Sequence, residues 1–285
     1  MQRLSTIAQW RDYARAQRLA GRSVGLVPTM GALHAGHASL FDEASSRGDV
    51  VIATIFVNPR QFGDPADLRA YPRTPEIDVR LAHEHGVDCL VEPSLDEMWP
   101  DYPEATATTV SVRGISELLE GAGRPGHFDG VASVVAKLFA VTGPCRAYFG
   151  EKDFQQIAVV RRMVTDLALP VEVVGCPIVR DEDGLALSSR NLLLSDSARR
   201  QALSLSQSLG AVGQSHLYAS AMRRTMRAVM QDAGVRVAYA DVVDPFTFVP
   251  ARDDESGPRR ALVAGVVDGI RLIDNAPVVV AARRD

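Results

Sequence analysis

The sequence has few cysteines and no long apolar run. Cys89, Cys145 and Cys176 are widely spaced and form no C-x-x-C motif, which argues against a disulfide framework or a cysteine zinc site and favours buried structural thiols. The longest apolar run, residues 50–57, is too short to span a bilayer, and the charged stretch 1–18 lacks the apolar core of a signal peptide. We therefore expect a cytoplasmic protein that does not bind a membrane.

A large excess of charge of one sign is also absent. The formal net charge is -4 and the sequence pI is about 5.9, so a general affinity for nucleic acid is not expected and any phosphate site must be built locally. Lysine occurs only at Lys137 and Lys152, and arginine supplies the rest of the 31 basic residues. The length of 285 residues and the 46% hydrophobic content suffice for one large domain or two ordinary ones.

The first two thirds of the chain alternate short apolar runs with helix-like segments. Strands are predicted over residues 23–29, 50–58, 87–93, 145–150 and 170–179, and helices over about 5–19, 36–47, 75–86, 129–142 and 153–167. Strands that are apolar throughout and separated by helices predict a parallel sheet covered on both faces. The expected α/β fold is a Rossmann-like, doubly wound parallel sheet domain in residues 1–178.

The pattern changes near residues 178–195. Ser195 is expected to cap a helix that runs to about 212, and the methionines of the stretch 222–230 have the spacing of a second buried helix. Strands are predicted over residues 235–244, 260–268 and 270–275. Residues 179–285 are therefore expected to form a smaller α+β C-terminal domain, in which the polar stretch 251–260 is a mobile loop.

Two histidines, His34 and His37, follow the first apolar strand in the stretch LVPTMGALHAGHASL. This places them at the carboxyl end of a parallel strand and in the first turn of a helix, where such sheets bind ligands. The helix start offers unpaired N–H groups, Gly31 and Gly36 allow close approach, and imidazoles can donate to phosphate oxygens. A nucleotide phosphate fits this place, although a pair of histidines packed near a turn would give the same pattern. Zinc is disfavoured because the glutamate of H-E-x-x-H and a third ligand are missing.

Two later segments carry cations or hydroxyl groups suited to phosphate. YFGEKDFQQI, at 148–157, places Lys152 after a strand, where its compact ammonium group could follow a phosphate; a solvated charged turn is the alternative. The stretch 179–195 offers Ser188, Ser189 and Arg190 to a polyphosphate, and a linker before a helix cap is the alternative. Because this second segment lies at the domain junction, we expect its residues 181–190 to be loose without ligand and to close over a bound ligand.

Two further segments offer groups for an acceptor substrate. The stretch 56–74 places the neutral amides of Asn58 and Gln61 after a buried strand, where they could hold a hydroxylated carboxylic acid. GRPGHFDGV, at 123–131, offers Arg124 and His127 just ahead of a helix. The alternative for the stretch 56–74 is a surface loop, and the alternative for 123–131 is a basic turn with a helix-start cap. The remaining histidines are expected on helix surfaces or loops: His83, His85 and His216.

These residues together resemble the pantothenate synthetase family, the pantoate:beta-alanine ligases of the H-x-G-H nucleotidyltransferase-like group. The matching stretches are VPTMGALHAGH, FVNPRQF, AYPRT, GRPGHFDGV, FGEKDFQQ and DGLALSSRN, in the family's order over residues 27–191. The resemblance implies that the carboxylate of (R)-pantoate attacks the α-phosphate of ATP to give pantoyl adenylate and diphosphate. The beta-alanine amine then displaces AMP to give pantothenate, the vitamin B5 precursor of coenzyme A. The resemblance also implies Mg²⁺ bound with ATP, and a homodimer formed through the N-terminal domain.

The resemblance also assigns roles to residues. The implied catalytic set is His37, as proton donor, with His34, Lys152 and Arg190. The implied ATP-binding set is Met30, Gly31, Ala32, Leu33, His34, Ala35, Gly36, His37, Gly150, Glu151, Lys152, Asp153, Val179, Leu187, Ser188, Ser189 and Arg190. The implied substrate-binding set is Gln61, Gln156, Asn58, Arg124 and His127, and Asp78 is an implied magnesium contact. Phe154 and Leu193 stand where the family often has tyrosine, which puts any hydrogen bond of a hydroxyl at position 154 in doubt.

Two other functions are compatible with the same motifs. An H-x-G-H adenylyltransferase acting on another small acceptor should carry a second basic phosphate patch, whereas the acceptor-side candidates Asn58, Gln61 and Gln156 are neutral amides. A non-catalytic nucleotide-binding module would keep the ligands without turnover. The ligase reaction is physically coherent because a carboxylate attacking ATP needs positioning, and needs cations or N–H donors where charge grows on diphosphate.

Overall fold

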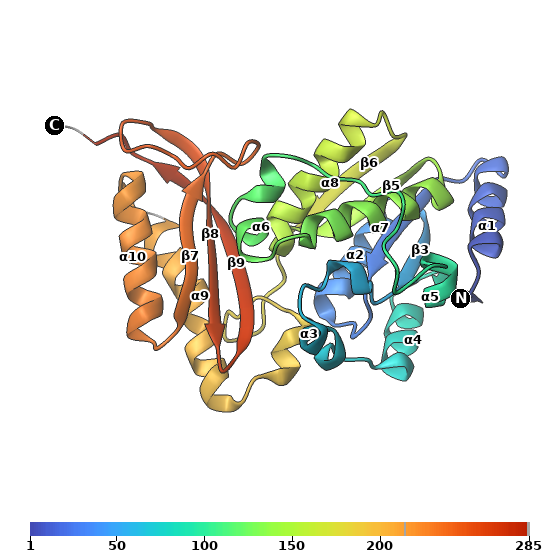
Figure 1. Ribbon diagram of the computed structural model, residues 1–285, viewed down its shortest axis with the longest axis horizontal. Helices are drawn as coiled ribbons and strands as arrows, with labels where there is room; N and C mark the ends of the chain where they lie inside the picture. The colour runs from blue at the N-terminus through green and yellow to red at the C-terminus, as the bar shows by residue number, and fades with distance from the viewer. Residues whose placement is uncertain (214, 284–285) are drawn as a thin grey trace. The chain divides into compact units, whose positions relative to one another are not determined.

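The structure is a computed structural model that describes residues 1–213 and 215–283. The chain divides into two compact units (Figure 1). The N-terminal unit consists of Met1–Glu151 and Gln155–Pro177, and the C-terminal unit of Lys152–Phe154 and Ile178–Asp285. The segment Lys152–Phe154 therefore groups with the C-terminal unit, although the chain on both sides of it groups with the N-terminal one.

A six-stranded parallel sheet forms the centre of the N-terminal unit, in the order β1-β4-β3-β2-β5-β6. Its strands are β1 (Gln2–Leu4), β2 (Val24–Thr29), β3 (Val50–Ile55), β4 (Cys89–Val91), β5 (Cys145–Gly150) and β6 (Val171–Cys176). β2 pairs with β3 from Val24↔Val50 to Thr29↔Ile55, and with β5 at Gly25↔Arg146. The chain thus winds outward from β2 in one direction and from β5 in the other, which confirms the predicted doubly wound sheet.

Helices cover this sheet on both faces. The helices of this unit are α1 (Ile7–Leu19), α2 (Ala35–Ser46), α3 (Pro65–Ala70), α4 (Pro75–Glu84), α5 (Leu95–Met98), α6 (Glu120–Gly123), α7 (His127–Thr142) and α8 (Phe154–Asp166), with 3-10 turns η1 (Pro59–Gln61), η2 (Ile115–Glu117) and η3 (Glu151–Asp153). Leu26 and Ile52 belong to a core with Trp10 of α1 and residues of α7, whereas Val27 and Val51 belong to a second core with α2 and α4. Because alternate strand residues face opposite cores, the strands are apolar at nearly every position.

The C-terminal unit contains a three-stranded antiparallel sheet in the order β7-β8-β9 and two long helices. The elements are η4 (Ser189–Leu193), α9 (Asp196–Gly213), α10 (Ala219–Asp232), β7 (Arg236–Val243), β8 (Gly257–Val267) and β9 (Ile270–Val280). Ser195 caps α9 by accepting from the backbone N–H of Ala198, as predicted. The predicted methionine stripe is confirmed as core: Met222, Met226 and Met230 are all fully buried. In the part of the chain that the structure describes, no helix has both the length and the apolar character needed to cross a bilayer.

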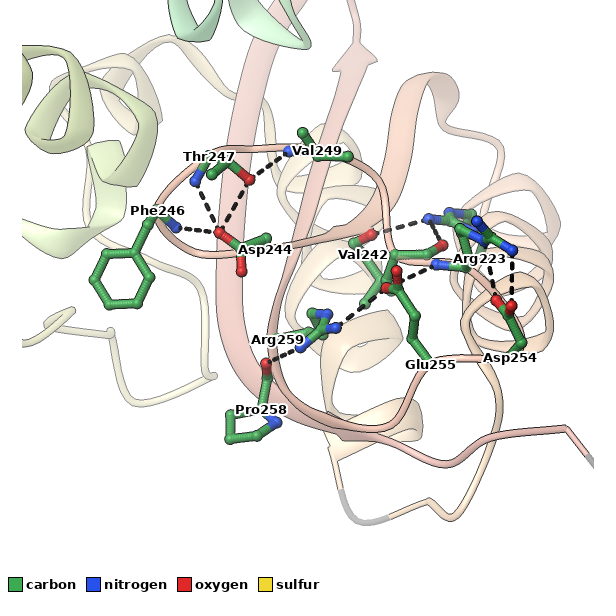
Figure 2. Close-up of polar contacts among 12 residues, drawn as sticks. Arg223, Val242, Asp244, Phe246, Thr247, Val249, Asp254, Glu255, Pro258 and Arg259 are labelled. Atoms are coloured by element: carbon green, nitrogen blue, oxygen red, sulfur yellow. Dashed lines mark hydrogen bonds and ion pairs between the residues drawn. The ribbon is translucent and has the colours of Figure 1, made fainter.

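The connection between β7 and β8 differs from the mobile loop predicted for residues 251–260. β8 begins at Gly257, so the end of this stretch is strand. In the preceding residues, the Glu255 carboxylate lies 3.1 Å from the guanidinium of Arg259 on β8 (Figure 2), and Asp253 accepts two bonds from Ser220 on α10. The acidic residues of this stretch thus meet partners within the unit, which a sequence pattern of polar residues does not reveal.

The three cysteines are free thiols, as the sequence predicts. Cys89 and Cys176 are buried and Cys145 is half-buried. Burial raises the pKa of Cys89 and of Cys145 to about 12, and that of Cys176 to about 11. These thiols therefore stay protonated at neutral pH, which favours a structural role.

A buried carboxylate joins three central strands at the amino edge of the sheet. The Asp49 side chain, just before β3, is fully buried and accepts from the Tyr148 hydroxyl and from Arg146 Nη1 of β5, both at 2.6 Å. Gly25 of β2 makes room, because a Cβ there would lie 3.0 Å from the Asp49 Cβ and 3.2 Å from the Tyr148 ring. Burial, together with the bond to Asp49, raises the pKa of Tyr148, so the hydroxyl remains a donor.

We predict that Tyr148→Phe lowers the free energy of unfolding by about 1–3 kcal/mol, because it leaves one buried oxygen of Asp49 without its donor. Urea unfolding of the purified protein measures this. Tyr102→Phe makes the same chemical change at an exposed position, and should alter stability by less than about 0.5 kcal/mol. Equal stability of the two variants would show that the Tyr148 hydroxyl contributes nothing.

Candidate functional site

The two predicted histidines cap the start of α2, directly after β2. His34 is the N-cap residue, and its Nδ1 accepts from the backbone N–H of Gly36 at 3.1 Å. His37 Nδ1 accepts from the backbone N–H of His34 at 3.3 Å. Because a backbone N–H can only donate, both Nδ1 atoms are unprotonated, and each neutral ring carries its proton on Nε2. The ring centroids are 4.2 Å apart, so the two imidazoles lie side by side at the start of α2. The Gly36 N–H, expected to be unpaired, is already bonded to His34, so it is the positive end of the helix dipole that favours an anion here.

The loop before these histidines is held by Asp78 of α4. Asp78 is 2% exposed; its Oδ2 accepts from the N–H of Ala32 at 3.0 Å, and its Oδ1 from the N–H of Leu33 at 2.7 Å and the hydroxyl of Thr74 at 2.8 Å. These bonds stabilise a turn in which Gly31 and Ala32 both have positive φ, +79° and +48°. Asp78 therefore anchors the stretch Met30 to Leu33.

This arrangement does not favour the magnesium contact expected at Asp78. Both carboxylate oxygens already accept bonds from protein donors, and the side chain is buried. Within residues 1–213 and 215–283, no group of three or more His, Cys, Asp and Glu side chains could hold a metal ion.

A second cluster forms around Gln61 at the end of β3. Asn58 is 1% exposed; its Nδ2 donates to Gln61 Oε1 and to the carbonyl of Gly130, both at 3.1 Å. Its Oδ1 accepts from Trp99 Nε1 at 3.0 Å and from the backbone of Arg60. With its donors and acceptor engaged by protein groups, Asn58 orients Gln61.

Gln61 also connects this cluster to the loop before the histidines. Its Nε2 lies 3.1 Å from the sulfur of Met30. His127, the first residue of α7, donates from Nδ1 to the backbone carbonyl of Gln61 at 2.8 Å, and its Nε2 accepts from Arg124 at 3.2 Å. The structure thus brings together five predicted site residues of the N-terminal unit: Met30, Asn58, Gln61, Arg124 and His127.

α7 approaches η1 closely enough to require glycine at Gly130. A Cβ at this position would lie 2.2 Å from the carbonyl oxygen of Arg60. The contact fixes the backbone from which Gln61 projects.

The carboxyl end of β5 supplies Gly150 and Glu151, next to β2 in the sheet. The strand order reverses between β2 and β5, and ligands of open parallel sheets bind at such a switch point. Gln156 is half-buried on α8, while its neighbour Gln155 is 3% exposed. Gln155 donates to the carbonyls of Ile115 and Leu118, so it holds the chain near η2.

The remaining predicted residues lie in the C-terminal unit: Lys152, Asp153, Val179, Leu187, Ser188, Ser189 and Arg190. The Lys152 side chain is 19% exposed, and its Nζ lies 3.6 Å from Asp153 Oδ1. Ser188 caps η4, because its hydroxyl accepts from the N–H of Arg190 at 3.3 Å. The predicted site residues are therefore divided between the two units.

Residues 181–190 are predicted to be loose without ligand, whereas the structure shows a hydrogen-bonded turn from Val179 to Leu187. The N–H of Leu187 donates to the carbonyl of Val179, and Arg180 pairs with Asp274 of β9 at 2.6 and 2.9 Å. Arg199 of α9 pairs with Asp181 and with Asp183. The hydrogen bond from Arg199 lowers the pKa of Asp183. The acidic turn therefore meets arginines that are distant in sequence.

Two residues of these clusters were missed by the sequence reasoning. Gln155 adjoins the predicted Gln156, is buried, and donates to backbone carbonyls near η2. Trp99 bonds to Asn58 from 41 positions away. The sequence offered one indication of its importance, because the chain contains only two tryptophans.

Comparison with known proteins gives matches along the whole chain. The model of a family described as Pantoate-beta-alanine ligase matches residues 2–277. A pantothenate synthetase of Cereibacter sphaeroides is 49% identical over 279 residues, covering 96% of this chain and 99% of that protein. A solved structure of pantothenate synthetase from Thermus thermophilus has a TM-score of 0.85 and 46% identity, covering 97% of this chain and 99% of that one. A pantoate-beta-alanine ligase from Francisella tularensis, described as complexed with beta-gamma ATP and beta-alanine, has a TM-score of 0.81 and 32% identity, covering 97% of each chain.

We predict that Asp78→Asn speeds hydrogen exchange at the amides of Ala32 and Leu33 by roughly 10- to 100-fold. An asparagine keeps the shape but presents its own N–H groups to one of the backbone donors and removes a charge-assisted acceptor. Hydrogen exchange read by mass spectrometry or NMR measures the effect. Asp42→Asn removes a carboxylate of α2 that pairs with His85 at the surface, and should leave exchange at Ala32 and Leu33 unchanged. Unaltered exchange in Asp78→Asn would contradict the anchoring role.

Proposed function

This chain belongs to the pantoate-beta-alanine ligase family and is a ligase of that class, and we propose that it joins (R)-pantoate to beta-alanine through a pantoyl adenylate. ATP is the adenylating substrate, and AMP and diphosphate are released as pantothenate forms. The observation that carries the proposal is the paired histidine cap, which presents two Nε2–H donors at the start of α2 and the carboxyl end of β2. The ATP and beta-alanine named for the Francisella tularensis relative support it.

In the proposed first step, a pantoate carboxylate oxygen attacks the α-phosphorus and the bond to the β-phosphate oxygen breaks. Negative charge grows on diphosphate, so donors aimed at it stabilise the transition state more than the ground state. His34 and His37 supply such donors from the N-terminal unit, and Lys152 and Arg190 supply cations from the C-terminal unit. Mg²⁺ carried by ATP would neutralise part of the phosphate charge.

In the proposed second step, the beta-alanine amine attacks the acyl carbon, the carbon–oxygen bond to AMP breaks, and the amine loses a proton. Gln61 and Gln156 hold pantoate for both steps with neutral amides, which can donate to a carboxylate and accept from a hydroxyl. Asn58, Arg124 and His127 act on Gln61: Asn58 bonds its side chain, and the other two bond its backbone carbonyl. We propose that these three residues position the Gln61 amide that holds pantoate.

The proposal extends to the organisation of the protein. Residues 1–178 bind nucleotide and pantoate, and residues 179–285 act as a lid that brings Ser188, Ser189 and Arg190 to the phosphates. The turn from Val179 to Leu187 is bonded within its own unit, and we propose that it moves as part of that unit. A homodimer and a cytoplasmic location, implied by the family resemblance, belong to the same proposal.

The proposed adenylate is tested by isotope exchange between labelled diphosphate and ATP. With Mg²⁺ and pantoate but without beta-alanine, we expect exchange that depends on pantoate, because only a reversible first step returns label to ATP. Adding beta-alanine should produce AMP and pantothenate in equal amounts. Folded protein that shows no pantoate-dependent exchange would exclude the proposed first step, and exchange with another acid or nucleotide acceptor alone would favour an adenylyltransferase.

We predict that His34→Ala and His37→Ala each lower the rate of this exchange by ~100-fold or more, with a smaller effect on ATP binding, because each removes a donor to developing charge. Exchange kinetics and calorimetric titration of ATP measure the two quantities. His85→Ala is the matched control, since His85 is paired with Asp42 on the surface, and should keep normal rates. A folded His37→Ala protein with full activity would rule out the catalytic role.

A further inference from the structure

Two adjacent residues of β9 hold two separate segments of the predicted phosphate site. Asp274 accepts hydrogen bonds from Nη1 and Nη2 of Arg180, at 2.6 and 2.9 Å, at the start of the turn that leads to Ser188. Asn275 donates from Nδ2 to the backbone carbonyl of Lys152 at 2.9 Å. Asp274 and Asn275 are 3% and 2% exposed, so these bonds are made away from water. One strand thus supports both segments within the C-terminal unit.

Arg260 of β8 orients the Asn275 amide and packs on the same segment. Its Nε donates to Asn275 Oδ1 at 2.7 Å, which leaves the Asn275 Nδ2 directed at Lys152. Its guanidinium carbon lies 4.1 Å from the centre of the Phe154 ring. A cation stacks on the face of a phenyl ring without needing a hydroxyl, so phenylalanine suits this contact.

Phe248 contacts Phe154 from the β7–β8 connection. Its centroid lies 5.9 Å from that of Phe154, and it is fully buried with a φ of +60°. The preceding turn stabilises this unusual backbone: Asp244 Oδ1 accepts from the N–H groups of Phe246 and Thr247 (Figure 2), and the Phe248 N–H donates to the Asp244 carbonyl. The segment Lys152–Phe154 is therefore fixed at its first residue by a hydrogen bond and at its last by two packed side chains.

We propose that Asn275 and Arg260 are positioning residues for Lys152. This inference rests on the proposed function, in which the Lys152 ammonium group acts on the ATP phosphates. A lysine side chain has four rotatable carbon-chain bonds, so its ammonium group is placed accurately only where its backbone is fixed. The bond from Asn275 fixes that backbone, and Arg260 fixes Asn275. Neither residue is expected to touch substrate.

A double-mutant cycle with Lys152 tests the proposal. We expect Asn275→Ala to lower kcat of pantoate-dependent diphosphate exchange by roughly 10- to 100-fold, as for a misplaced catalytic group, with KM for ATP changed less. Lys152→Ala should be at least as slow. The double variant Lys152→Ala/Asn275→Ala should be no slower than Lys152→Ala, because Asn275 acts only through Lys152.

Controls separate positioning from general damage. Val279→Ala alters an exposed side chain on the same strand, and should keep the wild-type kcat and melting temperature. If Asn275→Ala does not fold, Arg260→Lys replaces it in the double-mutant cycle with Lys152→Ala. Lysine keeps the buried charge but loses the Nε donor and the planar stack on Phe154. Full kcat in folded Asn275→Ala, or effects that multiply in the double variant, would overturn the proposal while leaving the proposed function intact. A wild-type protein without pantoate-dependent exchange would instead exclude the proposed function.

Discussion

The hydrogen bonds that the Asp78 carboxylate accepts from the amides of Ala32 and Leu33 are the constraint on which the proposed site depends. A chain leaving β2 must turn sharply to start α2, and the turn observed places a glycine and an alanine at positive φ. A buried carboxylate that accepts two backbone N–H groups offsets the cost of that conformation. Because His34 and His37 follow directly, their place at the sheet edge depends on an aspartate more than 40 positions away.

Hydrogen bonding to the backbone selects different proton positions for the site histidines. His34 and His37 accept at Nδ1, so each neutral ring carries its proton on Nε2. His127 bonds a carbonyl oxygen through Nδ1, so that nitrogen must carry the proton, and Nε2 accepts from Arg124. The same residue type thus accepts from backbone N–H groups at the α2 N-terminus in one place, and donates to the backbone carbonyl of Gln61 in another. A motif containing histidine gives no information about this difference, which is set by the atoms facing each ring.

Local sequence patterns predicted most helices and strands, whereas contacts between residues distant in sequence could not be predicted. Apolar strands separated by helices predicted the parallel sheet, because both of its faces are covered. β1 was missed because its three residues are too few to show a period, and it forms by pairing with β4. The anchoring role of Asp78 and the bonded turn from Val179 to Leu187 depend on partners distant in sequence. The sequence places the motif segments at strand ends. Only the three-dimensional structure shows which side chain orients which other one.

The scarcity of lysine now has a physical interpretation. Arginine makes the structural pairs of the C-terminal unit, such as Arg180 with Asp274, where a planar fork bonds two oxygens at once. Lys137 donates to the carbonyl of Met98 and lies 5.1 Å from the Trp99 ring centre, and burial lowers its pKa. Trp99 in turn bonds to Asn58, which orients Gln61. Lys137 thus contacts Trp99, the residue that bonds the partner of Gln61, whose amide is proposed to hold pantoate. The other lysine, Lys152, is bonded through its backbone carbonyl by Asn275, and in the proposed function its ammonium group acts on the phosphates.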